Sequence, residues 1–296
     1  MGNNLLWSHQ VNTMDKLLFF DIDGTLTYPR SEPSPATVDA IRSARSNGHK
    51  VFLSTGRTPD SVPDAVMKIG FDGGIFSAGG CVMYGDTVLS HHFMPDLLVQ
   101  KILILLRDKS IFFKLETADG RFRSENGRAI LSQVNMAGAS SEMQRFTEEL
   151  LCDPRLRPLS QYSGQPVYKI SFFSIDRTMA DHLSAALEGS AKVVRFDNLV
   201  PDFPLTAGEI SDFSVSKGSA LQEICRHLGK TAADCVAIGD SMNDAEILKA
   251  AGLGIAMGNA ETRVKELADM VCDRCENDGL AKAMLDLDLA VPPQIG

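Results

Sequence analysis

A run of four apolar residues, Leu17 to Phe20, leads directly into two aspartates separated by a single isoleucine. The run has the length and composition of a strand buried in a core. In an extended chain, residues i and i+2 lie on the same face, so Asp21 and Asp23 would repel each other. We therefore expect a cation, or another compensating positive charge, at the end of this strand.

Apolar runs and helical periodicity alternate after this first run. Further buried strands are expected at 50–54 and 74–77, with helices at about 35–46 and 58–69. Ser34 is the expected N-cap of the first helix, and Pro35 suits its first position. This alternation indicates a parallel sheet covered by helices on both faces.

The alternation stops between about Phe93 and Leu205. The expected elements of this segment are helices at about 95–108, 127–151 and 177–187, strands at 111–116, 167–173 and 192–196, and a hairpin turn at 119–120. The first pattern then resumes with helices at 216–228 and 243–250, strands at 235–238 and 253–256, and a last helix from about 278. We predict an α/β fold: a Rossmann-like, doubly wound parallel sheet core with an inserted α+β domain.

The predicted parts of the chain are a core at 15–92 plus 206–296, an inserted domain at 93–205 and a mobile leader at 1–14. The leader lacks the basic and apolar segments of a secretion signal. The longest uninterrupted aliphatic run, Ile102 to Leu106, is far too short to span a bilayer. We expect a cytoplasmic protein without a membrane partner, either a monomer or a small homo-oligomer.

Net charge and cysteine content exclude two further classes. The formal net charge of −9 argues against a general nucleic-acid binder. The six cysteines show no disulfide framework. Cys272 and Cys275 form a C-x-x-C, but no second pair or histidine cluster accompanies them, so we do not expect a metal there.

Acidic residues gather where the predicted core strands end. Asp21 and Asp23 end the first strand, and Asp240 ends the strand at 235–238, with Asp244 one helical turn later. Ligand sites of open parallel sheets lie beyond the carboxyl ends of the strands. Four carboxylates without zinc-type histidines or thiolates indicate a hard cation, Mg²⁺.

The same edge carries groups that suit a phosphoryl group. The backbone N–H groups of Gly24 and Gly56 can approach an anion closely, and Thr55 adds a hydroxyl donor. Lys217 adds a positive charge near a helix start, and Asn243 can donate a hydrogen bond. A carboxylate nucleophile with such donors and a metal suits transfer through an aspartyl phosphate.

Four segments resemble, in order and spacing, the motifs of the haloacid dehalogenase-like hydrolases. They are DIDGT at 21–25, LSTGR at 53–57, SKGSAL at 216–221 and GDSMND at 239–244. The insertion is similar to the α/β C2 cap (type IIB) of the Cof-type phosphatases, and AMGNA at 256–260 fits that subfamily. One departure is SAGG at 77–80, where many relatives carry Asn-Gly, which puts a contact from position 79 in doubt.

The resemblance implies a role for each matched residue. Asp21 is the expected nucleophile, and Asp23 the acid that protonates the leaving oxygen and then activates water. Thr55 and Lys217 are expected to orient and neutralise the phosphoryl oxygens, with Lys217 also holding Asp21.

The implied Mg²⁺ ligands are Asp21, the backbone carbonyl of Asp23, and Asp240. Asp244 is expected either as a further ligand or as a partner of the ligands.

Several residues keep two interpretations. Arg57 could contact the substrate or form an ordinary ion pair, and Asn243 could simply start a helix. Arg121, Arg123 and Lys169 of the insertion could face the substrate, although charged residues on exposed strands usually meet solvent.

The predicted function is a Mg²⁺-dependent phosphatase of small phosphomonoesters, namely sugar phosphates or nucleotide and cofactor phosphates. A phosphomutase or phosphotransferase would use the same aspartyl phosphate and is the alternative. A non-enzymatic phospho-aspartate receiver would need neither Asp23 nor a large insertion, and dehalogenation would need no metal cluster.

Overall fold

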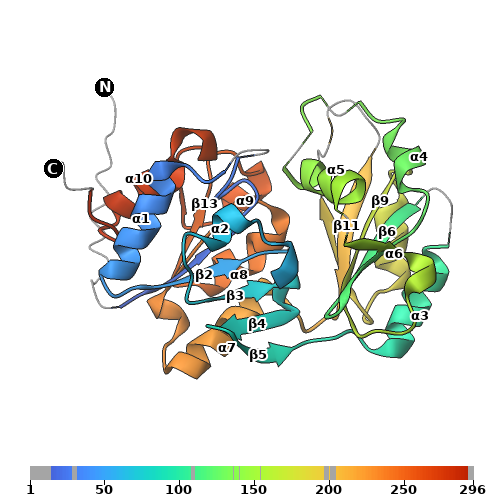
Figure 1. Cartoon of the computed structure of the whole chain (residues 1–296), viewed down its shortest axis with the longest axis horizontal. Coiled ribbons are helices and arrows are strands. Elements are labelled where there is room, and N and C mark those ends of the chain that lie inside the picture. Colours follow the sequence, from blue (N-terminus) through green and yellow to red (C-terminus); the bar gives the residue numbers. More distant parts are fainter. Residues whose placement is uncertain are drawn as a thin grey trace.

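The computed structural model of the 296-residue chain describes residues 15–28, 32–107, 111–135, 137–139, 141–153, 155–196, 200 and 205–292. The predicted leader at 1–14 lies outside these residues. Figure 1 shows two lobes, each built around its own sheet. Within the described residues, every helix is too short or too polar to cross a membrane.

The first lobe contains an eight-stranded sheet in the order β14-β13-β12-β1-β2-β3-β4-β5. Its strands are β1 (Leu17–Phe20), β2 (Lys50–Ser54), β3 (Gly73–Phe76), β4 (Cys81–Tyr84), β5 (Thr87–His91), β12 (Cys235–Gly239), β13 (Leu253–Ala256) and β14 (Met270–Val271). The six strands from β14 to β3 are parallel, and β4 and β5 are antiparallel additions at the edge. β1 therefore lies between β2 and β12, which come from opposite ends of the chain.

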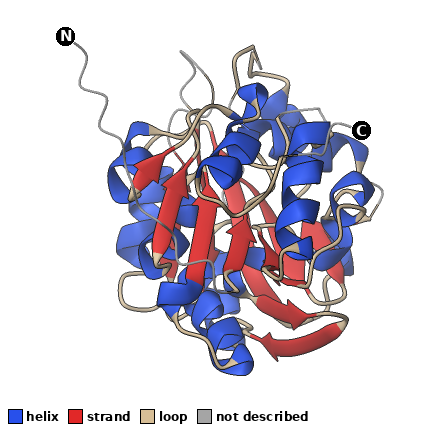
Figure 2. Ribbon diagram, turned by 90° about the vertical axis from the view of Figure 1, so that its left-hand side faces the viewer, coloured by secondary structure: helices blue, strands red, loops and turns tan. Residues whose placement is uncertain are grey.

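Helices cover both faces of this sheet (Figure 2). On one side lie α1 (Pro35–Ser46) and α10 (Gly279–Asp286), on the other α7 (Lys217–Leu228), α8 (Ala245–Ala250) and α9 (Thr262–Leu267). Alternate residues of β1 divide accordingly: Leu18 and Phe20 pack in the cluster of α1 and α10, while Leu17 and Phe19 pack in that of α7 and α8. The predicted doubly wound core is confirmed.

The second lobe contains a six-stranded sheet in the order β10-β11-β9-β6-β7-β8. Its strands are β6 (Ile111–Thr117), β7 (Gly120–Arg123), β8 (Leu156–Pro158), β9 (Val167–Ser174), β10 (Lys192–Phe196) and β11 (Thr206–Ser211). Helices α3 (Asp96–Leu105) and α6 (Met179–Ala186) pack on one face, and α4 (Gly127–Leu131) and α5 (Ser141–Cys152) on part of the other. This lobe is the predicted inserted α+β domain, and we refer to it as the cap.

Three local expectations need correction. The helix expected at 58–69 is a 3₁₀ turn at Pro59–Ser61 followed by the short helix α2 (Asp64–Met67), because Pro63 precedes α2 and interrupts a longer helix. The helix expected at 127–151 is divided into α4 and α5. The expected boundary at 205 is too early, because β11 pairs with β9 and β10 and so belongs to the cap sheet.

The segment at 77–80 explains the departure from the family pattern. Ser77 and Ala78 have positive φ values of 48° and 57°, and Gly79 has a φ of 110°. A Cβ at position 79 would lie 2.4 Å from the carbonyl oxygen of Ser216. Ser216 is the N-cap of α7, so a residue without a side chain is required where this turn meets the start of that helix.

The close approach of Gly79 to α7 gives a stability test. Gly79→Ala should lower the free energy of unfolding by about 1–3 kcal/mol more than Gly85→Ala. Gly85 also has a positive φ, 56°, but a Cβ there would meet no atom within 4 Å, so it controls for backbone conformation. Urea unfolding followed by circular dichroism measures both losses, and equal losses would contradict the proposed contact.

Candidate active site

The ends of β1 and β12 bring distant carboxylates together. Phe20 is paired in register with Ile238, and the backbone N–H of Asp21 donates to the carbonyl of Ile238 at 3.0 Å. Asp21 and Asp240 consequently leave the sheet side by side. Together with Asp244 they form a buried group whose ligand oxygens all lie within 4.8 Å of one another. We call these three residues the acid cluster.

Lys217 lies in the middle of this site. Its Nζ donates to Oδ1 of Asp21 at 2.8 Å, to Oδ1 of Asp244 at 2.6 Å and to Oδ1 of Asn243 at 3.0 Å. Its side chain is 0% exposed. Burial acts to lower the pKa of Lys217, but Asp21 and Asp244 outweigh it and the pKa is raised. Lys217 is therefore a buried, charged ammonium group.

The pKa of Asp21 is raised by its burial and by the carboxylates around it. Burial, which is the largest cause, and repulsion by Asp244 and Asp23 outweigh the attraction of Lys217 and together raise this pKa to about 8. Without a cation, Asp21 therefore tends to hold a proton at neutral pH. The donor set of the cluster consists of carboxylate oxygens, which fits a hard divalent cation such as Mg²⁺.

Asp244 has both oxygens engaged within the protein. While Oδ1 meets Lys217, Oδ2 accepts the backbone N–H groups of Asp240 and Ser241, both at 3.1 Å. These contacts favour the prediction of Asp244 as a partner that orients the loop of Asp240.

Asp23, in the first turn after β1, still repels Asp21 as expected but has a cation of its own. Asp23 forms a two-fold contact with Arg57, from Nε to Oδ2 at 2.8 Å and from Nη2 to Oδ1 at 2.7 Å. Asp23 is thus paired with Arg57, whereas Asp21 shares Lys217 with Asp244. The side chain of Asp23 lies outside the acid cluster.

The second predicted motif lies beside the first because β2 neighbours β1. Thr55 is buried, and its Oγ1 accepts the backbone N–H of Arg57 at 3.1 Å. Gly56 faces Asn243, whose Nδ2 lies 3.5 Å from where a Cβ of residue 56 would be. The structure therefore brings Thr55, Gly56 and Asn243 to the edge where Asp21 lies.

Gly24 is needed for close approach rather than only for its backbone N–H. It has a φ of 91°, and a Cβ there would lie 2.0 Å from Oδ2 of Asp240. A side chain at position 24 would therefore displace the carboxylate of Asp240.

Asn259 is a site residue that the sequence analysis did not single out, although AMGNA at 256–260 contains it. Its Nδ2 donates to the carbonyl of Gly24 at 2.8 Å and to Oδ2 of Asp240 at 3.3 Å. Its Oδ1 accepts the backbone N–H of Cys275 at 2.9 Å. Asn259 therefore holds the turn after β1 against Asp240.

The C-x-x-C lies next to this network as two half-buried free thiols. Cys272 contacts the sulfur of Met257 at 3.4 Å, and Cys275 donates to the carbonyl of Thr25 at 3.3 Å. Burial raises the pKa of Cys272 to about 11 and that of Cys275 to about 12, which keeps both thiols neutral.

A doubly wound core with a carboxylate cluster at the carboxyl edge of its sheet, and a second domain inserted beside that edge, defines a capped α/β enzyme. The family described as haloacid dehalogenase-like hydrolase matches residues 18–284. The chain belongs to this family, which confirms the predicted resemblance and its hydrolytic class.

Individual relatives agree with this assignment. The chain is 27% identical over 288 residues to Phosphatase YwpJ of Bacillus subtilis, a match that covers 92% of this chain and 99% of the relative. It is 30% identical over 276 residues to the HMP-PP phosphatase of Yersinia enterocolitica, covering 90% and 93%. A solved subclass IIB sugar phosphatase of the same superfamily has a TM-score of 0.77 at 23% identity, covering 93% and 99%, and shows the same capped fold.

Replacement of Asn259 should weaken cation binding while leaving the fold intact. In Asn259→Ala the turn at Gly24 and the carboxylate of Asp240 lose a shared donor. We expect the Mg²⁺ concentration for half-maximal activity to rise about 10- to 100-fold. Asn277→Ala is the matched control, because the side-chain amide of Asn277 donates to the exposed Asp273 at 3.1 Å, outside the acid cluster. Equal Mg²⁺ requirements in the two variants would exclude this role.

Proposed function

We propose that this protein is a Mg²⁺-dependent phosphatase that hydrolyses small phosphomonoesters through an aspartyl phosphate on Asp21. The observation that carries the proposal is the buried arrangement of Asp21 against Lys217, within the acid cluster. A nucleophilic carboxylate held by an ammonium group beside a cation site suits attack on a phosphoryl dianion.

The names of the relatives support small phosphate esters as the substrates. Those compared above are named as phosphatases, and another relative, 27% identical, is a phosphoglycolate phosphatase of Methanoculleus marisnigri. We infer a small phosphorylated metabolite, either a sugar phosphate or a nucleotide or cofactor phosphate, as the substrate class. We also infer a cytoplasmic location, where such metabolites are found.

In the first step, a carboxylate oxygen of Asp21 forms a bond to phosphorus while the bond from phosphorus to the leaving oxygen breaks. Asp23 gives its proton to that oxygen, so the leaving group departs as an alcohol. Lys217 holds Asp21 in position and offsets negative charge on the phosphoryl oxygens. We expect the hydroxyl of Thr55, the N–H of Gly56 and the amide of Asn243, which lie at the same edge, to donate to the same oxygens.

In the second step, Asp23 takes a proton from a water that attacks the phosphorus of the aspartyl phosphate. The bond from phosphorus to Asp21 breaks, which releases phosphate and restores the carboxylate. A Mg²⁺ held by Asp21, Asp240 and the carbonyl of Asp23, with Asp244 beside them, would supply charge neutralisation for the phosphoryl group.

Arg57 gives this scheme a specific requirement. In the structure, Arg57 holds both oxygens of Asp23, and their side chains are only 12% and 16% exposed. The first step requires the protonated form, so Arg57 must release at least one oxygen of Asp23 when the substrate binds.

The two aspartates should fail in different ways when each is replaced. Asp21→Asn should reduce multiple-turnover hydrolysis to below about 1% of wild type for every ester, because the nucleophile is lost. Asp23→Asn should form the phospho-enzyme from an aryl phosphate, whose leaving oxygen needs little protonation, but not from an alkyl phosphate. Rapid-quench measurement of protein-bound and free phosphate distinguishes the two. Equal losses on aryl and alkyl esters in Asp23→Asn would argue against the acid role.

Cation removal tests the acid cluster directly. Three buried carboxylates and a dianionic substrate together outweigh the positive charge of Lys217, so a chelator should abolish activity and added Mg²⁺ should restore it. Zn²⁺ should do no better than Mg²⁺, because thiolate and imidazole ligands are not part of the cluster. Full activity in a chelator, with metal content verified by elemental analysis, would refute the metal requirement.

A further inference from the structure

Two free cysteines lie in contact in the core, at the end of the sheet opposite to the acid cluster. Cys225 belongs to α7 and Cys235 is the first residue of β12, and their Sγ atoms are 3.2 Å apart. Both are buried in the apolar cluster between α7 and the sheet, at 2% and 1% exposure. A disulfide has an S–S length of about 2.05 Å, so the two sulfurs would have to approach by only about 1.1 Å.

The backbone fixes both residues in this position. Cys235 is held by the pairing of β12 with β1, and the carbonyl of Cys225 accepts the N–H of Lys230 at 2.9 Å. The connection at 226–234 turns back at Gly229, which has a φ of 63° and ends α7. A cross-link would therefore need a small rotation of two side chains and no change in the fold.

The contact makes the two thiols unequal as acids. A hydrogen bond from Cys235 lowers the pKa of Cys225, and burial opposes this change. The same hydrogen bond, together with burial, raises the pKa of Cys235. Cys225 is therefore the thiol that loses its proton first and can attack an oxidant, while Cys235 is placed to attack second.

The C-x-x-C is less suited to form a bond, although the sequence draws attention to it. The Sγ of Cys272 contacts the sulfur of Met257, and the Sγ of Cys275 donates to the carbonyl of Thr25. These two thiols thus contact different partners, and burial raises the pKa of both. The sequence pattern indicates one pair of cysteines, whereas the fold brings another pair into contact.

We propose that Cys225 and Cys235 form a reversible disulfide when the protein is exposed to a peroxide. The thiolate of Cys225 attacks one oxygen of hydrogen peroxide, the O–O bond breaks, and the sulfur becomes a sulfenic acid. The sulfur of Cys235 then attacks the sulfur of Cys225, and the hydroxide that leaves takes the proton of Cys235 as water. In total, two thiols are oxidised to one disulfide, and one hydrogen peroxide is reduced to two waters.

A small oxidant can reach the pair through the connection at 226–234. The Sγ of Cys235 lies 3.5 Å from the carbonyl of Thr231, and Thr231 is exposed. One residue therefore separates the pair from solvent on this side. Local opening of an exposed connection requires much less free energy than global unfolding, and hydrogen peroxide is little larger than water.

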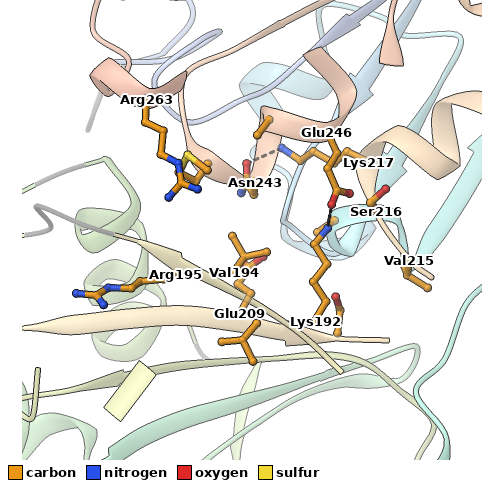
Figure 3. Close-up of a pocket in the computed structure, with 15 residues that line it drawn as sticks. Lys192, Val194, Arg195, Glu209, Val215, Ser216, Lys217, Asn243, Glu246 and Arg263 are labelled. Carbon is orange, nitrogen blue, oxygen red and sulfur yellow. Dashed lines mark hydrogen bonds and ion pairs between the residues drawn. The ribbon is translucent and has the colours of Figure 1, made fainter. Parts of the chain in front are cut away.

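The cross-link would join two elements that carry active-site residues. Lys217, the first residue of α7, lines a pocket of about 270 Å³ between cap and core together with Asn243 and Glu209 (Figure 3). Asp240 directly follows β12. Because the cysteines lie in the parts of α7 and β12 that are remote from these residues, we expect the disulfide to increase resistance to unfolding without altering the site.

The first test detects the bond itself. The folded, full-length protein is treated with hydrogen peroxide, its remaining thiols are blocked with iodoacetamide, and it is digested with trypsin without reduction. Cleavage places Cys225 on peptide 218–226 and Cys235 on peptide 231–249. The expected product is a cross-linked pair of these peptides that dithiothreitol separates. Unlinked peptides from the folded protein, or a cross-link that forms only in urea, would overturn the inference.

The same digest contains a control. Trypsin also cleaves after Arg274, so Cys272 lies on peptide 266–274 and Cys275 on peptide 275–282. We expect the yield of the Cys225–Cys235 cross-link to be at least about 5-fold higher than that of the C-x-x-C. An equal or higher yield at the C-x-x-C would overturn the inference, because it would show that contact in the fold does not select the pair.

The second test measures the effect on stability. Peroxide treatment should raise the thermal midpoint of unfolding by about 3–8 °C, as expected for a disulfide that closes a short loop in a chain of this size. All proteins carry Cys152→Ser, which removes the exposed thiol that could link two molecules.

Three further variants make this measurement specific. Cys225→Ala and Cys235→Ala should each show no rise on oxidation, whereas Cys81→Ala, which removes another buried thiol, should keep it. Each variant is compared with its own reduced form, so a general loss of stability does not affect the result. A rise that persists without Cys225 or Cys235, or a lower midpoint in the oxidised parent, would overturn the inference.

Discussion

The contact on which the rest of the site depends is the buried ammonium group of Lys217. This group binds Asp21, which follows β1, and Asp244, which follows β12. Lys217 is also the first residue of α7, so a single side chain connects these three elements. Because two carboxylates share one ammonium and Asp240 adds a third, the site keeps an excess of negative charge. Fully buried charge of this kind is costly unless it is compensated, and this excess is what makes the acid cluster fit a divalent cation.

The same contact constrains how the chain is connected. Asp21 and Thr55 precede the cap in sequence and Lys217 follows it, yet all three lie at one edge of the core sheet. The cap must therefore leave and return beside that edge, as its position in Figure 1 shows. Phosphoryl chemistry and recognition of the leaving group can then reside in different domains, which lets selectivity change without altering the charged core.

Much of the core could be predicted because its signals are local. β2 and β13 occur with the expected bounds, and α1 begins after Ser34, whose side chain accepts the N–H of Thr37. These elements combine apolar runs or caps with clear ends. The acids at the strand ends also followed from parallel pairing, since neighbouring parallel strands end at one edge.

Features that depend on contacts between distant segments could not be predicted in this way. β11 contains Gly208 and the buried Glu209, so its sequence lacks the pattern of a buried strand. The burial of Lys169 arises from the core lobe, which nothing near it in sequence indicates. Asn259 was visible only as part of a motif, because its bonds to Gly24 and Asp240 span 235 and 19 residues.

The contacts between cap and core are unequal in strength. This difference determines where a substrate can enter the space between the two domains. Tyr168 of β9 is buried in the core cluster and stacks on His91 of β5 with ring centroids 5.8 Å apart, while its hydroxyl lies 2.7 Å from Nδ1 of His91. On the rim, Lys192 pairs with Glu246 at 24% and 46% exposure, and Arg155 lies 3.8 Å from Asp60 with both about half exposed.

Exposed ion pairs of this kind contribute at most about 1 kcal/mol each. Separating the rim therefore costs far less than separating Tyr168 from its aromatic neighbours. The pocket beside Glu209 is lined on its outer side by Lys192 and Glu246, so the weakest contacts between the domains lie where the leaving group enters. The strong contact is at the linker between the domains, where Phe93 begins the cap. A substrate can therefore reach Glu209 when the ion pairs at the rim separate, while the contacts of Tyr168 keep the cap aligned with the core.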